Sequence, residues 1–351
     1  MTVTWRLLNY VSSDLKMNLA INEAVFRSRR MDLTPDTLHL WRGRKAVILA
    51  DRASYKDDID HEACRKYGVE IVRAMAVKPN VIYQDKGSLN FTLVLDASSL
   101  KGLVKDYQPV LSEYQIINEA IACGLKHFYA NIKTDHEGNY INGKKISEEL
   151  PTWFHNYLLF QGVIHVNTDL NIYKQIVKTY KKQITSLSHE LGREVEMEEV
   201  EKVILQSVEE TFAVKLKQQP PTEAEVKVAE KLRRIKYNSD KWIIYGHEPF
   251  LIGMGKTAVE VLVAYPPTSK CRKLIELVKD VVSDLKDEVE IRVWMRGKGF
   301  YQHGSHPEMS NALIQVGKRG EIPLIIVNGE LKFRGSIPSR EDLRKAILSA
   351  L

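Results

Sequence analysis

The stretch PPTEAEVKVAEKLRRIKYNSDKW, residues 220–242, contains the clearest helix start in the chain. Pro220 and Pro221 restrict the backbone just before the expected start of the helix. Thr222, followed three residues later by Glu225, is the pattern of a capping box. The stretch closes a region, residues 171–242, in which charged residues recur in helical patterns. We therefore expect this region to be helical, with most of its charges on solvated helix faces.

The 351 residues are more than one hydrophobic core usually accommodates, so we expect two domains. The stretch IIYGHEPFLIGMGKTA has four glycine or proline residues and no clear period, which is typical of a linker. We accordingly predict a first domain at 1–245, a linker at 246–258 and a second domain at 259–351.

Strand-like runs on either side of this linker set the expected fold class. In the first domain, TLHLWRG, KAVILAD, VEIVRAM, NVIYQ, LNFTLVLD and LLFQGVIHVNTDL read as strands among peripheral helices, with a hairpin turn at His136–Asn139. The second domain alternates strand, helix, strand, helix, strand, hairpin at Asn328-Gly329, strand and helix. We expect an α+β, mixed-sheet first domain and an α/β second domain.

Composition excludes several classes of function. The longest apolar runs are far shorter than the ~20 residues that cross a bilayer, and MTVTWRLLNY lacks the pattern of a leader, so we expect a cytoplasmic protein with no membrane contact. Three scattered cysteines predict no disulfide framework and no metal pair. The net charge of +6 is divided evenly between residues 246–351 and the rest, so nucleic acid is not an expected partner.

A family resemblance rests on motifs spread over residues 5–242. WRLLNY, NLAINEAVF, TLHLWRGRKAVILADRAS, INGKKIS and above all KYNSDKW, residues 236–242, follow one another as in the lipoate-protein ligase and octanoyltransferase family. The resemblance implies the mixed-sheet biotin/lipoate-ligase-like catalytic fold. It also implies activation of a lipoyl or octanoyl group and its transfer to a lysine of a carrier protein.

The same resemblance assigns the site residues. Lys145 matches the family lysine that contacts the acyl carboxyl and phosphate, and it is the implied catalytic residue. Glycine amides and a cation suit this chemistry because they stabilise negative charge as the acyl group leaves AMP. The implied substrate-binding residues are Arg73, Lys78, Asp85, Gly87, Ser147 and Gly162. An active ligase would use ATP with Mg and lipoate, and otherwise no cofactor is implied.

The chain departs from the family pattern at its ligand loop. Residues 77–80, Val-Lys-Pro-Asn, stand where three glycines are expected, and Glu148 and Glu149 replace small residues after Ser147. Pro79 offers no backbone N–H. Two interpretations stay open: an acyltransferase or ligase with an altered cradle, in which Lys78 supplies part of the lost contact, or a non-catalytic scaffold, a pseudoenzyme.

The second domain resembles the thioredoxin/glutaredoxin fold. YPPTSKC aligns with the segment that carries the two redox cysteines, so that Thr268 takes the first position and Cys271 the second. On that likeness Pro323 is the cis-proline. A threonine cannot form the attacking thiolate, so we expect Cys271 to be a structural cysteine in a redox-inactive docking domain, with a monothiol catalyst as the alternative. His303 and His306 lack a third ligand, and we assign no metal site.

The implied partners follow from the family. They are a lipoyl carrier protein, either a lipoyl domain or a GcvH-like protein, and a second ligase subunit, since we expect no carboxy-terminal ligase accessory domain in this chain.

Overall fold

The computed structural model describes residues 3–76, 80–100, 103, 109–179, 183–296, 309–317 and 322–351. The chain forms two compact units, Met1–His247 and Glu248–Leu351, each of which has its own core and is described by itself. The segment 246–258, expected as a linker, contains a short strand and the first residues of a long one, so the second unit begins earlier than its predicted start at 259.

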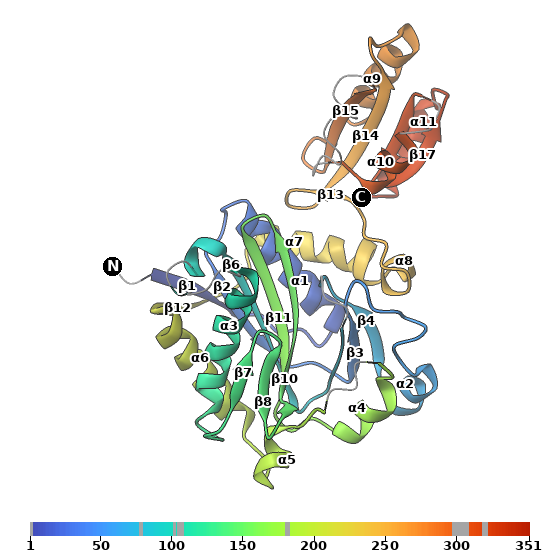
Figure 1. Cartoon of the computed structure of the whole chain (residues 1–351). Coiled ribbons are helices and arrows are strands. Elements are labelled where there is room, and N and C mark those ends of the chain that lie inside the picture. Colours follow the sequence, from blue (N-terminus) through green and yellow to red (C-terminus); the bar gives the residue numbers. More distant parts are fainter. Residues whose placement is uncertain are drawn as a thin grey trace. The chain divides into compact units, whose positions relative to one another are not determined.

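A six-stranded mixed sheet forms the centre of the first unit (Figure 1). Its order is β10-β11-β6-β2-β1-β12, antiparallel from β10 to β2 and parallel from β2 to β12. The strands are β1 (Val3–Leu8), β2 (Thr37–Trp41), β6 (Ser88–Asp96), β10 (Ser147–Phe154), β11 (Tyr157–His165) and β12 (Val214–Gln219). This confirms the predicted mixed-sheet α+β fold.

Two three-stranded sheets flank the large one. In the first, β3 (Ala46–Leu49) lies between β4 (Glu70–Arg73), which is parallel to it, and β5 (Val81–Gln84), which is antiparallel. In the second, β7 (Lys133–Asp135), β8 (Gly138–Ile141) and β9 (Lys144–Lys145) form an antiparallel meander. The meander includes the hairpin that was predicted around residues 136–139.

Helices fill the connections of the first unit. They are α1 (Leu15–Arg30), α2 (His61–Tyr67), the 3₁₀ helix Ala97–Leu100, α3 (Pro109–Leu125), α4 (Leu170–Ile176), α5 (Leu187–Leu191), α6 (Met197–Phe212), α7 (Glu223–Leu232), the π-helical turn Arg233–Tyr237 and α8 (Asp240–Ile243).

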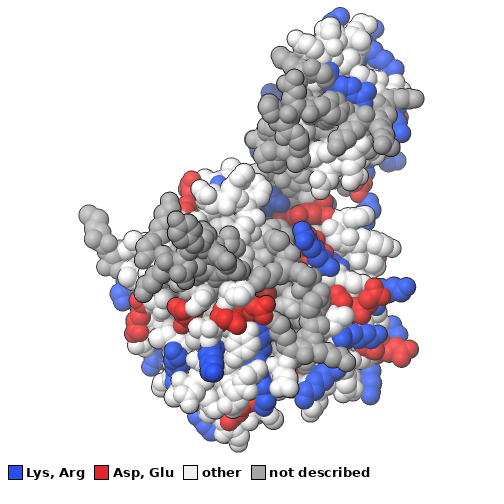
Figure 2. Space-filling model, in the orientation of Figure 1, with Lys and Arg blue, Asp and Glu red and all other residues white. Residues whose placement is uncertain are grey.

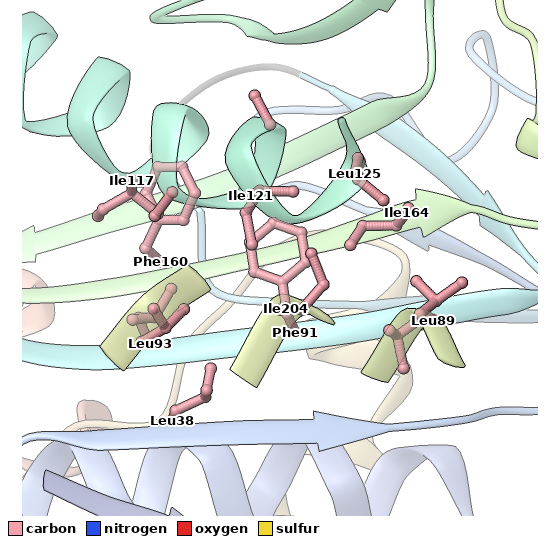
Figure 3. Close-up of a cluster of buried hydrophobic side chains, with 14 of the residues drawn as sticks. Leu38, Leu89, Phe91, Leu93, Ile117, Ile121, Leu125, Phe160, Ile164 and Ile204 are labelled. Carbon is pink, nitrogen blue, oxygen red and sulfur yellow. The ribbon is translucent and has the colours of Figure 1, made fainter. Parts of the chain in front are cut away.

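The core of the first unit lies between the large sheet and helices α3 and α6. Alternate residues of β6 point to this side, among them Phe91 and Leu93, and Phe160 of β11 joins them with its ring centroid 6.2 Å from that of Phe91 (Figure 3). Ile121 of α3 and Ile204 of α6 close over these side chains. Because side chains alternate along a strand, the residues between them face the other side of the sheet.

That other face carries polar side chains against α1. Asn22 of α1 donates to Thr92 Oγ1 of β6 at 2.9 Å and to Gln161 Oε1 of β11 at 3.3 Å, and its amide oxygen lies 2.8 Å from His39 Nδ1 of β2. All four residues are buried. Hydrogen bonds between side chains therefore hold this helix to the sheet, together with the apolar stripe of α1.

Local signals in the sequence are confirmed at several helix ends. Asp14 caps α1, Gly68 ends α2 in the left-handed conformation, and Thr222 and Glu225 form the predicted reciprocal capping box. The expectation that residues 171–242 are helical is wrong at β12, where Val214–Gln219 pairs in parallel with β1. This strand lies at the edge of the sheet and buries few side chains, so its apolar pattern is weak.

The second unit contains a five-stranded sheet (Figure 1). Its long strand β14 (Lys256–Ala264) pairs in parallel with β15 (Val289–Arg296) and antiparallel with β16 (Leu324–Val327) and β13 (Leu251–Ile252), while β17 (Glu330–Arg334) pairs with β16. The helices are α9 (Ser269–Val281), α10 (Asn311–Gly317) and α11 (Arg340–Leu348).

Two further features of the second unit were predicted from the sequence. Asn328 and Gly329 both have positive φ, as a two-residue hairpin turn requires. The Ile322–Pro323 peptide bond is cis, and Tyr265–Pro266 is a second cis bond that was not predicted.

Figure 2 shows acidic and basic side chains interspersed over the visible face of the described part of the chain. Within that part, no helix has the length and apolar character needed to cross a membrane.

Candidate functional site

Lys145 is placed by a tight hairpin between β8 and β9. Asn142 and Gly143 both have positive φ, at 51° and 76°, which reverses the chain in two residues. Successive side chains on a strand point in opposite directions. Lys144 reaches Glu190 at 3.0 Å on the partly exposed side, whereas Lys145 points inward and only 3% of it is exposed.

The ammonium group of Lys145 forms a buried ion pair. Its Nζ lies 3.2 Å from Glu149 Oε2, and Ser147 Oγ donates to the other oxygen of Glu149 at 2.7 Å. A Cβ at Gly138 would be 2.8 Å from Glu149 Oε1, so only glycine allows β8 this close to the carboxylate. Ser147, a predicted binding residue, therefore orients Glu149 in this structure.

Electrostatics keep Lys145 charged. Burial works against its charge, but Glu149 and the neighbouring Glu148 outweigh burial and raise the pKa of Lys145. Burial also raises the pKa of Glu149, while Lys145 and Ser147 oppose that rise. Glu149 accepts one of the three N–H donors of the ammonium, and the other two have no partner among the described residues.

A chain of buried polar groups continues from Glu148. Its Oε2 lies 3.2 Å from His165 Nε2, and His165 Nδ1 lies 3.2 Å from Thr168 Oγ1. Thr168 in turn contacts the Ser88 hydroxyl at 2.9 Å. No signal in the sequence indicated His165 or Thr168, because neither stands in a motif and His165 reaches Glu148 only through the pairing of β10 with β11.

Asp85 and Gly87 shape the turn before β6. Asp85 accepts from Gly87 N at 2.8 Å and from Asp169 N at 2.9 Å, so its carboxylate is committed to backbone amides. A Cβ at Gly87 would be 2.3 Å from the Asn167 carbonyl oxygen. This close approach explains why residue 87 is a glycine. The predicted contact of Asp85 and Gly87 with a substrate stays a prediction.

Gly162 also stands at a close approach. A Cβ there would lie 2.4 Å from Phe91 Cζ and 2.8 Å from the carbonyl oxygen of Glu148. The glycine lets β10, β11 and the core ring pack together. Its predicted role in binding is not tested by this packing.

Arg73 is buried at the end of β4, and its guanidinium donates to backbone carbonyl oxygens. Nε donates to Ile243 O at 3.0 Å, and Nη1 donates to Asp51 O at 2.8 Å and to Ala53 O at 3.0 Å. The Trp242 indole donates back to Arg73 O at 2.9 Å. These bonds join β4, the loop after β3 and α8, whereas the predicted contact of Arg73 with a ligand stays a prediction.

The ligand loop is only partly within the described residues. Lys78 and Pro79 lie outside them, so the role proposed for Lys78 stays a prediction. Asn80 is described: its side chain accepts from Val81 N at 2.9 Å and donates to the carbonyl oxygen of Glu149 at 3.5 Å.

The motif KYNSDKW forms a structural cluster. Lys236 is completely buried, with Nζ 2.9 Å from Glu23 Oε2 of α1 and 4.3 Å from the centre of the Trp242 ring. The Tyr237 hydroxyl donates to the same oxygen of Glu23 at 2.8 Å, and Arg27 pairs with the other carboxylate oxygen at 2.9 Å. The most specific motif in the sequence thus attaches the π-helical turn to α1.

A cavity of about 940 Å³ lies between α4 and α5. Lys144, Thr168, Tyr173, Thr185 and Arg193 are among the residues that line it. Lys145 does not line it, although Thr185 N donates to the carbonyl oxygen of Lys145 at 2.8 Å. A second, smaller cavity of about 640 Å³ is lined by Arg44, Asp85 and Gly87 among others.

Two of the residues predicted from the thioredoxin resemblance, Thr268 and Cys271, lie at the start of α9. Thr268 caps the helix by accepting from Cys271 N at 3.2 Å, and its hydroxyl lies 3.2 Å from Cys271 Sγ. Burial opposes ionisation of the Cys271 thiol, but the hydrogen bonds from Thr268 and nearby backbone outweigh it and lower the thiol pKa. Cys271 is buried, with 2% of the residue exposed.

Metal ligands do not cluster in the part of the chain that is described. There, no group of three or more His, Cys, Asp or Glu side chains is arranged to hold a metal ion. His303 and His306 lie outside that part.

Curated relatives match most of the first unit. An octanoyltransferase LipM of Carboxydothermus hydrogenoformans is 23% identical over 276 residues, covering 68% of this chain and 98% of the relative. Subunit 1 of lipoate-protein ligase A from Thermoplasma acidophilum is 23% identical over 260 residues, covering 67% and 94%.

Solved structures show the same fold. A lipoate-protein ligase A bound with ATP has a TM-score of 0.61 at 21% identity and covers 70% of this chain and 99% of its own. A Thermoplasma acidophilum lipoate protein ligase with bound lipoic acid has a TM-score of 0.59 at 21% identity, covering 70% and 100%. The family model of the lipoyl protein ligase A/B catalytic domain matches residues 14–209, and this chain belongs to that family.

Proposed function

We propose that the first unit transfers a lipoyl or octanoyl group to a lysine of a small carrier protein. The observation that carries the proposal is the buried, charged Lys145, two of whose N–H donors have no acceptor among the described residues. An unsatisfied buried donor is costly, and a bound acyl carbonyl oxygen would supply the acceptor. Membership of the lipoyl protein ligase family supports this choice of ligand.

The chemistry requires stabilisation of one developing negative charge. The amine of the carrier lysine attacks the acyl carbonyl carbon, the C–N bond forms, and the carbonyl oxygen becomes an oxyanion that Lys145 stabilises through its N–H donors. The bond to the leaving group then breaks; a thiolate takes up the proton that the amine loses, whereas AMP leaves as an anion and that proton passes to solvent. The leaving group is AMP when lipoate has been activated with ATP and Mg, or a thiol when the donor is a thioester.

Partners follow from the proposed reaction. The acceptor is a lipoyl carrier, a lipoyl domain or a GcvH-like protein, because the product is an acylated lysine on such a protein. A second polypeptide that assists the ligation, without being required for transfer, is also proposed, since one relative is itself named as subunit 1 of a ligase. The cytoplasm is the proposed location of the reaction.

The second unit is proposed to be a thioredoxin-like docking domain. Support comes from its strand order, in which β14 lies between β15, which is parallel to it, and β16, which is antiparallel. Along the chain, α9 connects β14 to β15. Thr268 stands where the attacking cysteine would be, and it caps α9. The unit then binds a partner without exchanging disulfides.

The direct test is carrier acylation by the purified full-length protein. One reaction contains lipoate, ATP, Mg²⁺ and a carrier domain, and a second contains an octanoyl thioester donor and the same carrier. Modification is measured as a mass increase of the carrier. Wild type should acylate the carrier in at least one reaction, and absence of product in both would refute the proposal.

Neighbouring lysines provide a matched control. Lys145→Ala should abolish product because the oxyanion loses its cation, whereas Lys144→Ala removes the same charge one residue away and should retain most activity. Circular dichroism must show that both variants are folded. Equal activity of the two variants would contradict the assigned role of Lys145.

A further inference from the structure

The charges around Lys145 show an excess of carboxylates. Glu149 is paired with its ammonium at 3.2 Å, and Glu148 and Glu137 also lie close enough to act on Lys145 electrostatically. Both Glu148 and Glu149 are buried, at 3% and 6% exposure, so their charges are poorly screened by solvent. The cation is thus already neutralised by the protein itself.

Strand alternation explains how two consecutive carboxylates fit here. Glu148 faces Val163 and Glu149 faces Gly162 in the β10–β11 register, so their side chains lie on opposite sides of the sheet. His165 is the partner of Glu148, and Lys145 is the partner of Glu149. Glu148 is hydrogen-bonded to His165. Glu149 is therefore the carboxylate that pairs directly with the ammonium group of Lys145.

We propose that Glu149 determines donor specificity: by pairing with Lys145 it admits an acyl donor that is uncharged at its carbonyl end, a thioester, and excludes a free carboxylate. This inference rests on the proposed function in that it takes the Lys145 site as an acyl site. A carboxylate would have to displace Glu149 or lie beside it unpaired, and like charges in a buried site repel strongly. A thioester carbonyl adds no charge and needs only the two N–H donors that Glu149 leaves.

The transfer that follows from a thioester is balanced without a further reactant. The carrier amine forms the C–N bond, the C–S bond breaks, and the proton from the amine ends on the released thiol. Lys145 keeps its proton throughout and stabilises the oxyanion.

Ligand binding to full-length protein, measured by calorimetry at pH 8, tests the inference without turnover. The probes are octanoate, which is anionic, and S-octanoyl-N-acetylcysteamine, which is an uncharged thioester of the same chain length. Wild type should bind the thioester at least about tenfold more tightly than octanoate. Glu149→Gln and Glu149→Ala should tighten octanoate binding by about tenfold or more and leave thioester binding within about threefold.

A control separates the local effect from the change in net charge. Glu190→Gln removes one negative charge beside Lys144, the neighbouring lysine of β9, and should change neither affinity by more than about twofold. In the double variant Lys145→Met with Glu149→Gln, the gain in octanoate binding should disappear. Two Glu149 variants are included so that one misfolded protein does not end the test.

Several results would overturn the inference. They are equal wild-type affinity for the two probes, no gain in octanoate binding on replacing Glu149, or no binding of either probe to any folded variant. Failure of the proposed function is distinguishable, because carrier acylation can be absent while the two affinities still change as expected.

Discussion

Acid should destabilise the first unit through Glu23, a carboxylate that is buried in α1. It contacts three groups: Arg27 one turn later, and Lys236 and Tyr237 of the π-helical turn. Burial disfavours its charge, but Lys236 and Arg27 outweigh burial and lower the pKa of Glu23 from 4.5 to about 2. The perturbation to make is Glu23→Gln, which keeps the shape and removes the charge.

The magnitude and its sign follow from linkage. A pKa lowered in the folded state means that the folded protein binds fewer protons than the unfolded chain, so the contribution is complete above the unfolded pKa. It is lost as pH falls from about 4.5 towards about 2. At about 1.4 kcal/mol per pKa unit, Glu23 contributes about 3 kcal/mol at neutral pH, which agrees with the usual cost of breaking a buried ion pair.

Urea denaturation between pH 7 and pH 2.5, followed by tryptophan fluorescence, measures this contribution. Four of the five tryptophans lie in residues 1–247, so the signal reports chiefly on the first unit. At pH 7 Glu23→Gln should reduce the free energy of unfolding by about 3 kcal/mol. In thermal unfolding, the same change corresponds to a midpoint temperature lower by roughly 6–12 °C. The difference between wild type and variant should shrink as the pH approaches 2.5.

An exposed ion pair provides the control. Glu198 pairs with Arg42 at 2.7 Å, but its side chain is 69% exposed, so solvent screens the pair and Glu198→Gln should lower stability far less than Glu23→Gln does. The reasoning about Glu23 is refuted if its variant and wild type differ by the same amount at pH 7 and at pH 2.5. It is also refuted if the two glutamine variants lose equal stability.

Three other perturbations test the roles assigned from geometry. Arg73→Lys should lower the melting temperature of the first unit by roughly 5–10 °C, since one ammonium cannot satisfy the carbonyls that the guanidinium joins; an unchanged melting curve would contradict this role. Gly87→Ala should be strongly destabilising because its Cβ meets backbone at 2.3 Å, whereas Gly192→Ala, with open space around it, should cost only about 1 kcal/mol, and a reversed order would count against the packing argument. Native protein should react with a thiol reagent at the exposed Cys123 and only slowly at the buried Cys271, and rapid labelling of Cys271 would support the monothiol alternative.

Local features of the fold were predictable because neighbouring residues determine them. The capping box of Thr222 and Glu225 and the hairpin at Asn328-Gly329 each need only a few consecutive residues. The strand β12 was missed because the strand that it pairs with, β1, lies more than 200 residues earlier. An edge strand of this kind has little apolar periodicity of its own.

The residue types at the site were predictable from the sequence, but the contacts between these residues were less predictable. The motif around Lys145 indicated a lysine that contacts an acyl ligand, and the sequence showed that Glu148 and Glu149 add negative charge nearby. Which carboxylate pairs with the lysine depends on strand register, on the side chain of Ser147 and on the absence of a Cβ at Gly138. None of these is fixed by the motif alone.

The Lys145–Glu149 pair has two roles that a single substitution cannot separate. Removing Lys145 leaves a buried carboxylate without its cation, so the variant loses stability even if the lysine has no part in transfer. Replacing both partners by apolar residues of similar size, Lys145→Met with Glu149→Leu, removes that penalty because no charge is left unpaired. A stable double variant without transfer activity would then identify Lys145 as catalytic, whereas a stable and active one would mean that the lysine serves only to neutralise Glu149.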